Sequence, residues 1–259
     1  MGGAFYEPRG GGRYLSTELT AGPWSSDSQH FGPPSALIVR ELERCAPRQD
    51  AVLSRVVFEI LGPVPVAELE VRARVERPGR TVELLSAELT AGSRPVVKAH
   101  AWRISGADTA AIAAGGPGRL EPPEAAGPMG IPDGWGRGYL DAMEWRTLRG
   151  GLFDQGGATV WVRPLVDLVD GEKTTALQRL FTVADSASGV SSLLDIRQWI
   201  FINTDLSVHL HRRPTGDWFA LDAETTIGPG GVGLATSALH DEAGPVGRTA
   251  QALVVRPRT

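Results

Sequence analysis

The sequence predicts an α+β protein built from two similar halves. Long segments of alternating or β-branched apolar residues are separated by short turns, which is the pattern of an antiparallel meander. One helical segment precedes this meander in each half, and a lone helix must lie against one face of its sheet. The order strand, strand, helix and four strands occurs twice, which indicates an internal duplication.

The clearest single element is the helix of the first half. Pro33 and Pro34 suit its first turn. Apolar residues then recur at helical spacing and predict one buried face, with Leu37, Ile38, Leu42 and Cys45. Charged residues fall largely on the other side and predict a face in water, with Arg40, Glu41, Glu43 and Arg44.

The remaining elements are predicted from the spacing of apolar residues and from the turn residues between them. After two short strands and the helix, the first half should hold strands over 53–61, 67–76, 80–89 and 95–104. The second half should hold strands near 143–148 and 157–165, a helix from about 175 to 190, and strands over 197–212, 218–227, 231–241 and 245–255. Residues 107–137 are rich in Ala, Gly and Pro and predict a linker. The predicted domains are therefore residues 1–106 and 138–259, joined by the linker 107–137.

The closing hairpins of the two halves also have similar residues at matching positions. Residues 86–89 and 94–99 are echoed by residues 236–239 and 244–249 at a constant offset of 150. A chance match of two hairpins punctuated by Gly and Pro is the alternative, and the repeated order of elements favours duplication.

Composition excludes several classes of protein. The formal net charge is −4 with no block of like charges, so neither a nucleic-acid partner nor binding to an anionic membrane surface is expected. Cys45 is the only cysteine, which excludes an intramolecular disulfide and any CxxC motif. No signal-peptide pattern opens the sequence and no 18 apolar residues run together, which predicts a cytoplasmic protein without a membrane span.

A polar stripe marks the strand predicted over 197–212. With period two, one face carries Asn203, Asp205, Ser207, His209 and His211. This face either lines a site or is the solvated outer face that antiparallel sheets usually have. Two imidazoles on one face could share a metal ion, but no third cluster supports them, and we predict no metal site.

Two further polar residues stand in apolar surroundings. Asp185 lies among small residues in the second predicted helix, where it could act as a base or orient a water; a helix cap is the alternative. Gln251 lies in the last strand, and a buried amide needs hydrogen-bond partners. The sequence lacks a G-x-S-x-G elbow, a Walker loop, G-x-G-x-x-G between strand and helix, and H-E-x-x-H. Serine-nucleophile and nucleotide-dependent mechanisms are therefore disfavoured.

These residues carry a family resemblance over almost the whole chain. The segment Asp205-Leu206-Ser207-Val208-His209-Leu210-His211-Arg212 is similar to the strand motif Asp-His-Ser-Met-Trp-Phe-His-Arg of acyl-CoA thioesterase II type double-hotdog thioesterases. Asp185 matches that family's Asp on the second central helix, and Gln251 matches its Gln in the final strand. The segment from His30 to Leu37 looks like the start of the family's first central helix.

The resemblance implies a double hotdog of the α+β class, with two antiparallel sheets that each wrap a central helix, fused in one chain. It implies hydrolysis of an acyl-CoA or acyl-carrier thioester by water, with no covalent intermediate, no cofactor and no metal. Asp185, Asn203 and Gln251 would be the catalytic residues, although the family has Ser or Thr where this chain has Asn203. Backbone amides near the N-terminus of a central helix would stabilise the oxyanion.

The remaining expectations concern the substrate and the alternatives. His30, Gly32, Thr204 and Asp205 are expected to bind the substrate, and Thr204 should point away from the face that carries Asn203. One alternative is a non-catalytic acyl-thioester binding protein. Another is a hydratase or dehydratase, for which His30 has no carboxylate nearby in sequence. The two halves should pair through their sheet edges, and a homo-oligomer is a further possibility.

Overall fold

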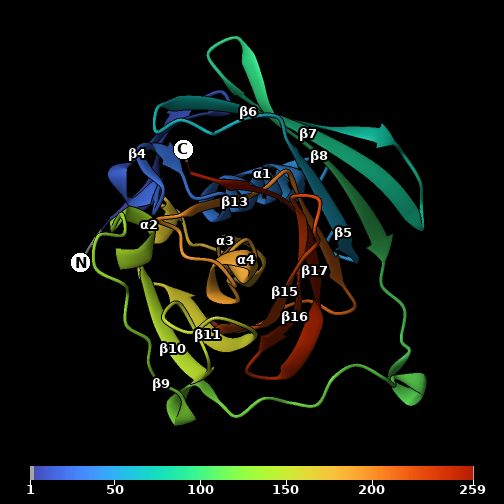
Figure 1. Ribbon diagram of the computed structural model, residues 1–259. Helices are drawn as coiled ribbons and strands as arrows, with labels where there is room; N and C mark the ends of the chain where they lie inside the picture. The colour runs from blue at the N-terminus through green and yellow to red at the C-terminus, as the bar shows by residue number, and fades with distance from the viewer. Residues whose placement is uncertain (1–2, 259) are drawn as a thin grey trace.

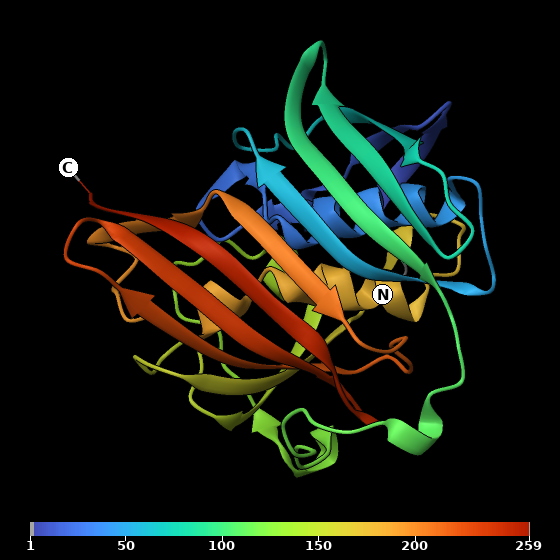
Figure 2. The ribbon, with the colours of Figure 1, turned by 90° about the vertical axis from the view of Figure 1, so that its right-hand side faces the viewer.

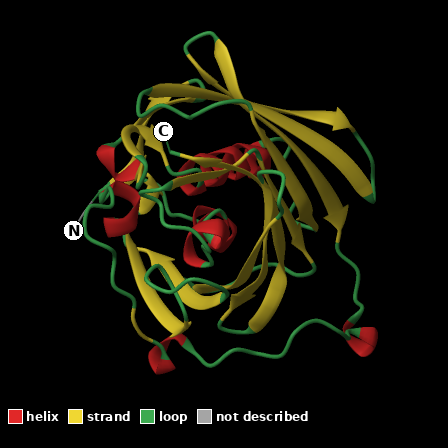
Figure 3. Ribbon diagram, viewed as in Figure 1, coloured by secondary structure: helices red, strands yellow, loops and turns green. Residues whose placement is uncertain are grey.

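The computed structural model describes residues 3–258, and strands dominate it (Figure 3). Four α-helices are present in this range: α1 Gly32–Arg44, α2 Gly138–Asp141, α3 Ala176–Ala184 and α4 Ala187–Val190. Three short 3-10 helices span Glu18–Thr20, Ala110–Ile112 and Pro123–Ala125. The helices α1, α3 and α4 lie inside the curve of the sheet (Figure 1), as expected of helices that bury an apolar face against strands.

The described part of the first half has eight strands: four precede α1 instead of the predicted two, and the four long strands after it follow the predicted order. The eight are β1 Ala4–Gly10, β2 Arg13–Ser16, β3 Ala21–Gly22, β4 Ser25–Gln29, β5 Ala51–Ile60, β6 Glu68–Arg77, β7 Val82–Ala91 and β8 Arg94–Ser105. Those of the second half are β9 Gly127–Pro128, β10 Met143–Arg149, β11 Ala158–Pro164, β12 Asp167–Val169, β13 Trp199–Asn203, β14 Asp205–Leu210, β15 Phe219–Ile227, β16 Val232–Asp241 and β17 Gly244–Pro257.

The prediction of two separate sheets is wrong. Fifteen of the strands join into one sheet in the order β12-β1-β2-β6-β7-β8-β5-β14-β17-β16-β15-β11-β10-β9, with β13 also paired to β17. The halves join where β5 pairs antiparallel with β14, from Glu59 opposite Asp205 to Arg55 opposite His209. Both strands would otherwise be edges with unpaired N–H and C=O groups, and their pairing satisfies those groups.

The closing hairpins of the two halves agree residue by residue. Leu89 lies opposite Val97 in β7 and β8, and Leu239 lies opposite Gly247 in β16 and β17. In each hairpin the register then shifts at the next residue. The two registers, including the irregularity, therefore coincide at the offset of 150 seen in the sequence, which supports the duplication.

The two central helices pack antiparallel to each other. Near the start of α1, Ser35 Oγ donates to the backbone oxygen of Phe181 in α3 at 3.0 Å. Near its end, Glu43 accepts from Gln178 Nε2, in the first turn of α3, at 2.7 Å. Phe58 of β5 packs edge-on against both Phe31 and Phe181. One large apolar cluster thus runs through both halves.

The prediction that one face of α1 is in water is wrong. Most of the helix is buried, and Arg40 is only 4% exposed. Its guanidinium forms an ion pair with Glu172, with Nε 2.9 Å from Oε2, and its Nη1 donates to the hydroxyl of Tyr14 at 2.6 Å. The second half covers the face that an isolated first half would expose, and the Arg40 charge persists there because Glu172 pairs with it.

The segment after β8 passes around the outside of the sheet before it reaches the second half (Figures 1 and 2). Within residues 107–137 it holds only β9 and two 3-10 helices. Over residues 3–258, no helix combines the length and the apolar character needed to cross a membrane.

The close approach of α1 and α3 predicts a stability effect at Gly32. A Cβ added there would lie 2.1 Å from the backbone oxygen of Thr182, so Gly32→Ala must push the helices apart. We expect this variant to lose about 1–3 kcal/mol in urea unfolding. Gly118→Ala is the matched control, since a Cβ there meets no atom within 4 Å. Equal stability of the two variants would contradict this packing.

Candidate active site

The site forms where the predicted second helix breaks. Instead of one helix over 175–190, α3 ends at Ala184 and α4 begins at Ala187. The hydroxyl of Tyr139 donates to the Thr182 oxygen at 2.9 Å, and the Ser186 N–H donates to Val183 instead. Because the Thr182 carbonyl accepts from Tyr139 and not from the N–H of Ser186, the regular hydrogen-bond pattern of α3 stops there. Asp185 therefore lies at the C-terminal end of α3.

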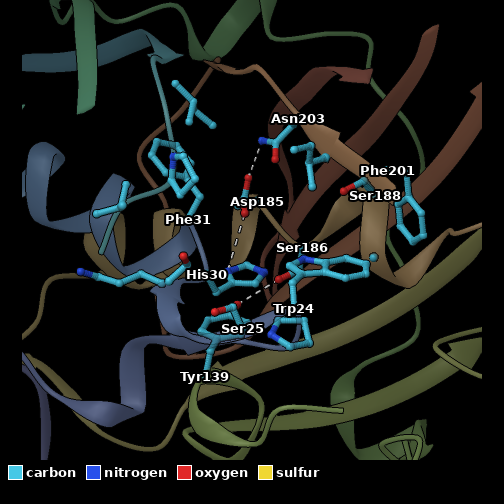
Figure 4. Close-up of a pocket in the computed structure, with 18 of the residues that line it drawn as sticks. Trp24, Ser25, His30, Phe31, Tyr139, Asp185, Ser186, Ser188, Phe201 and Asn203 are labelled. Carbon is cyan, nitrogen blue, oxygen red and sulfur yellow. Dashed lines mark hydrogen bonds and ion pairs between the residues drawn. The ribbon is translucent and has the colours of Figure 1, made fainter. Parts of the chain in front are cut away.

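Three groups surround the Asp185 carboxylate, which is only 6% exposed (Figure 4). Its Oδ1 accepts from Asn203 Nδ2 at 2.8 Å and from Gln251 Nε2 at 2.9 Å. The backbone N–H of Phe31 also faces the carboxylate and favours its ionised form. The structure therefore brings together the three residues that the sequence proposed as catalytic.

Burial dominates the electrostatics of this carboxylate. Desolvation raises the pKa of Asp185 to about 7, even though hydrogen bonds from Asn203, Gln251 and Phe31 lower it. The group therefore changes charge near neutral pH, where a general base is most effective.

A bulge aims Asn203 at the carboxylate. Asn203 lies opposite Leu253 and Ser207 lies opposite Ala250, so the strand takes four steps while β17 takes three. Both amide protons of Asn203 are used, since Nδ2 also donates to the Asp205 oxygen at 3.0 Å. Its Oδ1 has no partner among the described residues and remains available as an acceptor.

Asn203 and Thr204 both border the pocket, as do Phe201 and Ile202 just before them. Asp205, which was expected to bind the substrate, does not line this pocket. Its Oδ1 instead accepts from the backbone N–H of Ala252 in β17 at 2.7 Å.

Gln251 is fully buried, and both ends of its amide are hydrogen-bonded within the protein. Besides Asp185 Oδ1, its Nε2 donates to the Asp185 backbone oxygen at 3.1 Å. Its Oε1 accepts from the Ser188 N–H at 3.3 Å. Gln251 does not line the pocket, so it holds the turn between α3 and α4 in place.

His30 joins the site from the first half. Its ring stacks on Tyr139 with centroids 3.8 Å apart and 4° between the planes. Its Nδ1 lies 3.7 Å from Asp185 Oδ2, so the structure supplies the carboxylate that the sequence near His30 lacks. Burial lowers the pKa of His30 to about 3, which makes the imidazole neutral and the contact no ion pair. Gly32, the other expected residue of this segment, donates its N–H to His30 and does not line the pocket.

A pocket of about 400 Å³ opens beside these groups. Aromatic side chains form much of its wall, and Trp24 packs edge-on against Phe201 and tilted against Trp135. Apolar residues from both halves complete it, among them Ile60, Val64, Leu152 and Val190. No local pattern in the sequence marks Trp24, Trp135 or Tyr139 as site residues, because Trp24 and Trp135 lie in two separate turns and Tyr139 lies in α2.

The two histidines considered as metal ligands lie elsewhere. His209 and His211 are both exposed on the polar face of the sheet. Over residues 3–258, no three or more His, Cys, Asp or Glu side chains group in a way that could hold a metal ion.

Comparison with known families decides the family of the chain. Residues 20–104 match the model of the acyl-CoA thioesterase N-terminal domain, and residues 122–255 match that of the acyl-CoA thioesterase C-terminal domain. The chain belongs to the acyl-CoA thioesterase family. The resemblance drawn from Asp185, Gln251 and the strand motif is therefore confirmed. No curated protein matches this chain.

Solved structures show the fold of this thioesterase-family chain. A conserved protein of unknown function with hot dog fold from Alicyclobacillus acidocaldarius is 14% identical, with a TM-score of 0.75 over 96% of this chain and 94% of that one. The tesB protein of Mycobacterium avium subs paratuberculosis is 16% identical, with a TM-score of 0.69 over 97% and 96%. Acyl-CoA thioesterase II TesB2 from Mycobacterium marinum is 12% identical, with a TM-score of 0.68 over 98% and 95%. The hotdog part of the fold prediction is confirmed.

The raised pKa of Asp185 predicts a stability cost above neutral pH. The folded state holds a proton up to about pH 7, whereas the unfolded carboxyl releases it near 3.8, so stability falls as pH rises between these values. Asp185→Asn keeps an Oδ1 acceptor and removes the charge. We expect the free energy of unfolding of the variant, relative to wild type, to rise through this window by about 2–4 kcal/mol.

Asp195→Asn is the control for this titration. Asp195 pairs with Arg197 on the surface, and its pKa is lowered to about 2, so it titrates below the window. Its stability difference from wild type should stay flat between pH 5 and pH 8. A flat difference for Asp185→Asn as well would contradict the raised pKa of Asp185.

Proposed function

We propose that the chain is an acyl-CoA hydrolase that uses water as the nucleophile. The observation that carries this proposal is the buried carboxylate of Asp185, which titrates near neutral pH beside an apolar pocket in a member of the acyl-CoA thioesterase family. Release of a free fatty acid and CoA would place the protein in lipid metabolism. The cytoplasmic location and the homo-oligomer stay predictions.

Asp185 and Asn203 would hold the attacking water between them. Asn203 and Gln251 occupy Oδ1 of Asp185, which leaves Oδ2 for the first proton of the water. Asn203 Oδ1 has no partner among the described residues and would accept a hydrogen bond from the second O–H of the water. Asn203 can therefore orient the water in the position where the family has a hydroxyl residue.

Gln251 would act on the water only through Asp185. Its amide is fully buried and its hydrogen bonds go to Asp185 and Ser188. By donating to the carboxylate, Gln251 lowers the pKa of Asp185 and fixes the orientation of the group. It is a positioning residue in this proposal.

The substrate would extend from this centre into the pocket. Aromatic and aliphatic side chains suit an acyl chain, which binds by burial of apolar surface. Thr204 and His30 line the pocket and would contact the thioester end of the substrate. The thiol carrier would be CoA or an acyl-carrier protein.

Hydration of an enoyl thioester is the second candidate. It is favoured by the 3.7 Å contact between His30 Nδ1 and Asp185 Oδ2, because this reaction would need a histidine and a carboxylate together. The loss of enoyl-CoA absorbance without CoA release would identify this reaction.

The first prediction of the proposal is thiol release from acyl-CoAs of increasing chain length, followed with a chromogenic thiol reagent. The value of kcat/KM should rise as pH passes through about 7, because Asp185 must lose its proton to act as a base. Asp185→Asn should lose about 10²- to 10⁴-fold in kcat while it remains folded. Absence of release from the wild type across the panel would sink the proposal.

Two substitutions of Asn203 act as controls in the same assay. Asn203→Thr supplies the hydroxyl residue of the family and should keep activity, whereas Asn203→Leu removes both the donor and the acceptor and should lose it. If wild type binds acyl-CoA tightly without release and Asn203→Thr gains turnover, the chain is the non-catalytic binding protein.

A further inference from the structure

His30 is held more firmly than a residue that only lines a pocket. Its ring is stacked flat on Tyr139, whose hydroxyl is fixed by Thr182 and by Ser186 at 2.9 Å each. Its Nδ1 accepts the Gly32 N–H at 3.0 Å. Figure 4 shows Asn203, Asp185, His30 and Tyr139 in succession along one side of the pocket.

The contact with Gly32 decides where the imidazole carries its proton. A backbone N–H can only donate, so Nδ1 must accept, and the single proton of the neutral ring lies on Nε2. Burial lowers the pKa of His30, so the ring stays neutral. Nε2 has no hydrogen bond among the described residues, yet it is not among their buried unpaired atoms, and the ring lines the pocket. Nε2–H is therefore a fixed donor that a ligand can reach.

The N-terminus of α1 has no free amide for a developing oxyanion. An α-helix leaves its first four N–H groups without intrahelical partners, and these are the usual donors at such a site. In α1, Pro33 and Pro34 have no N–H at all. The Gly32 N–H donates to His30, and the Phe31 N–H faces the Asp185 carboxylate. The expected backbone oxyanion donors at this helix are thus already engaged or missing.

We propose that the Nε2–H of His30 donates a hydrogen bond to the carbonyl oxygen of the bound thioester and to the oxyanion formed there. The inference rests on the proposed function and adds the group that stabilises its transition state. Nδ1 of His30 lies 3.7 Å from Asp185 Oδ2. The distance from Nε2 to Oδ2 can exceed this value by no more than the separation of the two nitrogens within the ring. That span suits one water on Asp185 and one carbonyl carbon beside it.

The reaction then balances without a proton transfer by His30. The water oxygen bonds to the carbonyl carbon, its proton passes to Asp185 Oδ2, and the carbonyl π pair moves to the oxygen held by His30. The carbonyl re-forms, the C–S bond breaks, and the leaving thiolate takes the proton from Asp185. His30 cannot be the base, because Nε2 already carries a proton and Nδ1 accepts from Gly32.

A matched pair of substitutions tests the donor. His30→Phe keeps a flat ring on Tyr139 and loses Nε2–H, so kcat should fall about 10²- to 10³-fold with KM changed only a few-fold. His30→Gln can place an amide N–H near the position of Nε2 and should recover part of kcat. Thermal unfolding of each variant checks that it is folded.

An infrared readout separates this role from a structural one. The probe is an acyl-CoA analogue in which a methylene replaces the thioester sulfur and the carbonyl is ¹³C-labelled. Bound to wild type, its carbonyl stretch should shift to lower frequency than in apolar solvent, and the shift should be lost in His30→Phe and kept in Asp185→Asn. An unchanged shift and an unchanged kcat in His30→Phe would overturn the inference.

Two further results keep the test decisive. If His30→Phe does not fold, ¹⁵N NMR of wild-type His30 takes its place, and a proton on Nδ1 would overturn the inference. Wild-type protein that releases no thiol would instead defeat the proposed hydrolysis. Hydrolysis that needs Asp185 and not His30 would leave the proposed function standing and defeat only the role of His30.

Discussion

The site depends on the close contact of two antiparallel helices. Where α1 begins and α3 ends, a hydrogen atom at Gly32 is all that fits against the Thr182 oxygen. This contact brings His30 and Phe31 of the first half up to Asp185 of the second. Neither half alone contains the whole constellation, and the pairing of β5 with β14 holds the two halves in one sheet around it.

The chemistry follows from what this junction does to two titratable groups. Burial disfavours charge on both, so it raises the pKa of Asp185 to about 7 and lowers that of His30 to about 3. A carboxylate with a pKa near 7 can take a proton from water. A neutral imidazole with a fixed tautomer can donate a hydrogen bond to a carbonyl oxygen. The same burial makes the ionised carboxylate a cost to folding, which is a common relation between stability and activity at a catalytic site.

Much of the site could be predicted from the sequence because its residues lie in recognisable local patterns. Asp185 stands out among small residues, and Asn203 begins a polar stripe with period two. The patterns could not predict what distant segments do to them. Tyr139 stops α3 by taking the Thr182 carbonyl, and one extra residue shifts the register of the strand between Asn203 and Ser207. The burial of Arg40 could not be predicted from its local pattern either, since it depends on Glu172, which lies 132 residues away in the sequence.

The most direct test of this account is the titration of Asp185 itself. In protein labelled with ¹³C at the aspartate carboxyl groups, the resonance that disappears in Asp185→Asn identifies the residue. We predict that this resonance titrates with a midpoint near pH 7, as desolvation by burial requires. A midpoint near the ordinary value of 3.8 would show a solvated carboxylate and would contradict the assignment of Asp185 as the base.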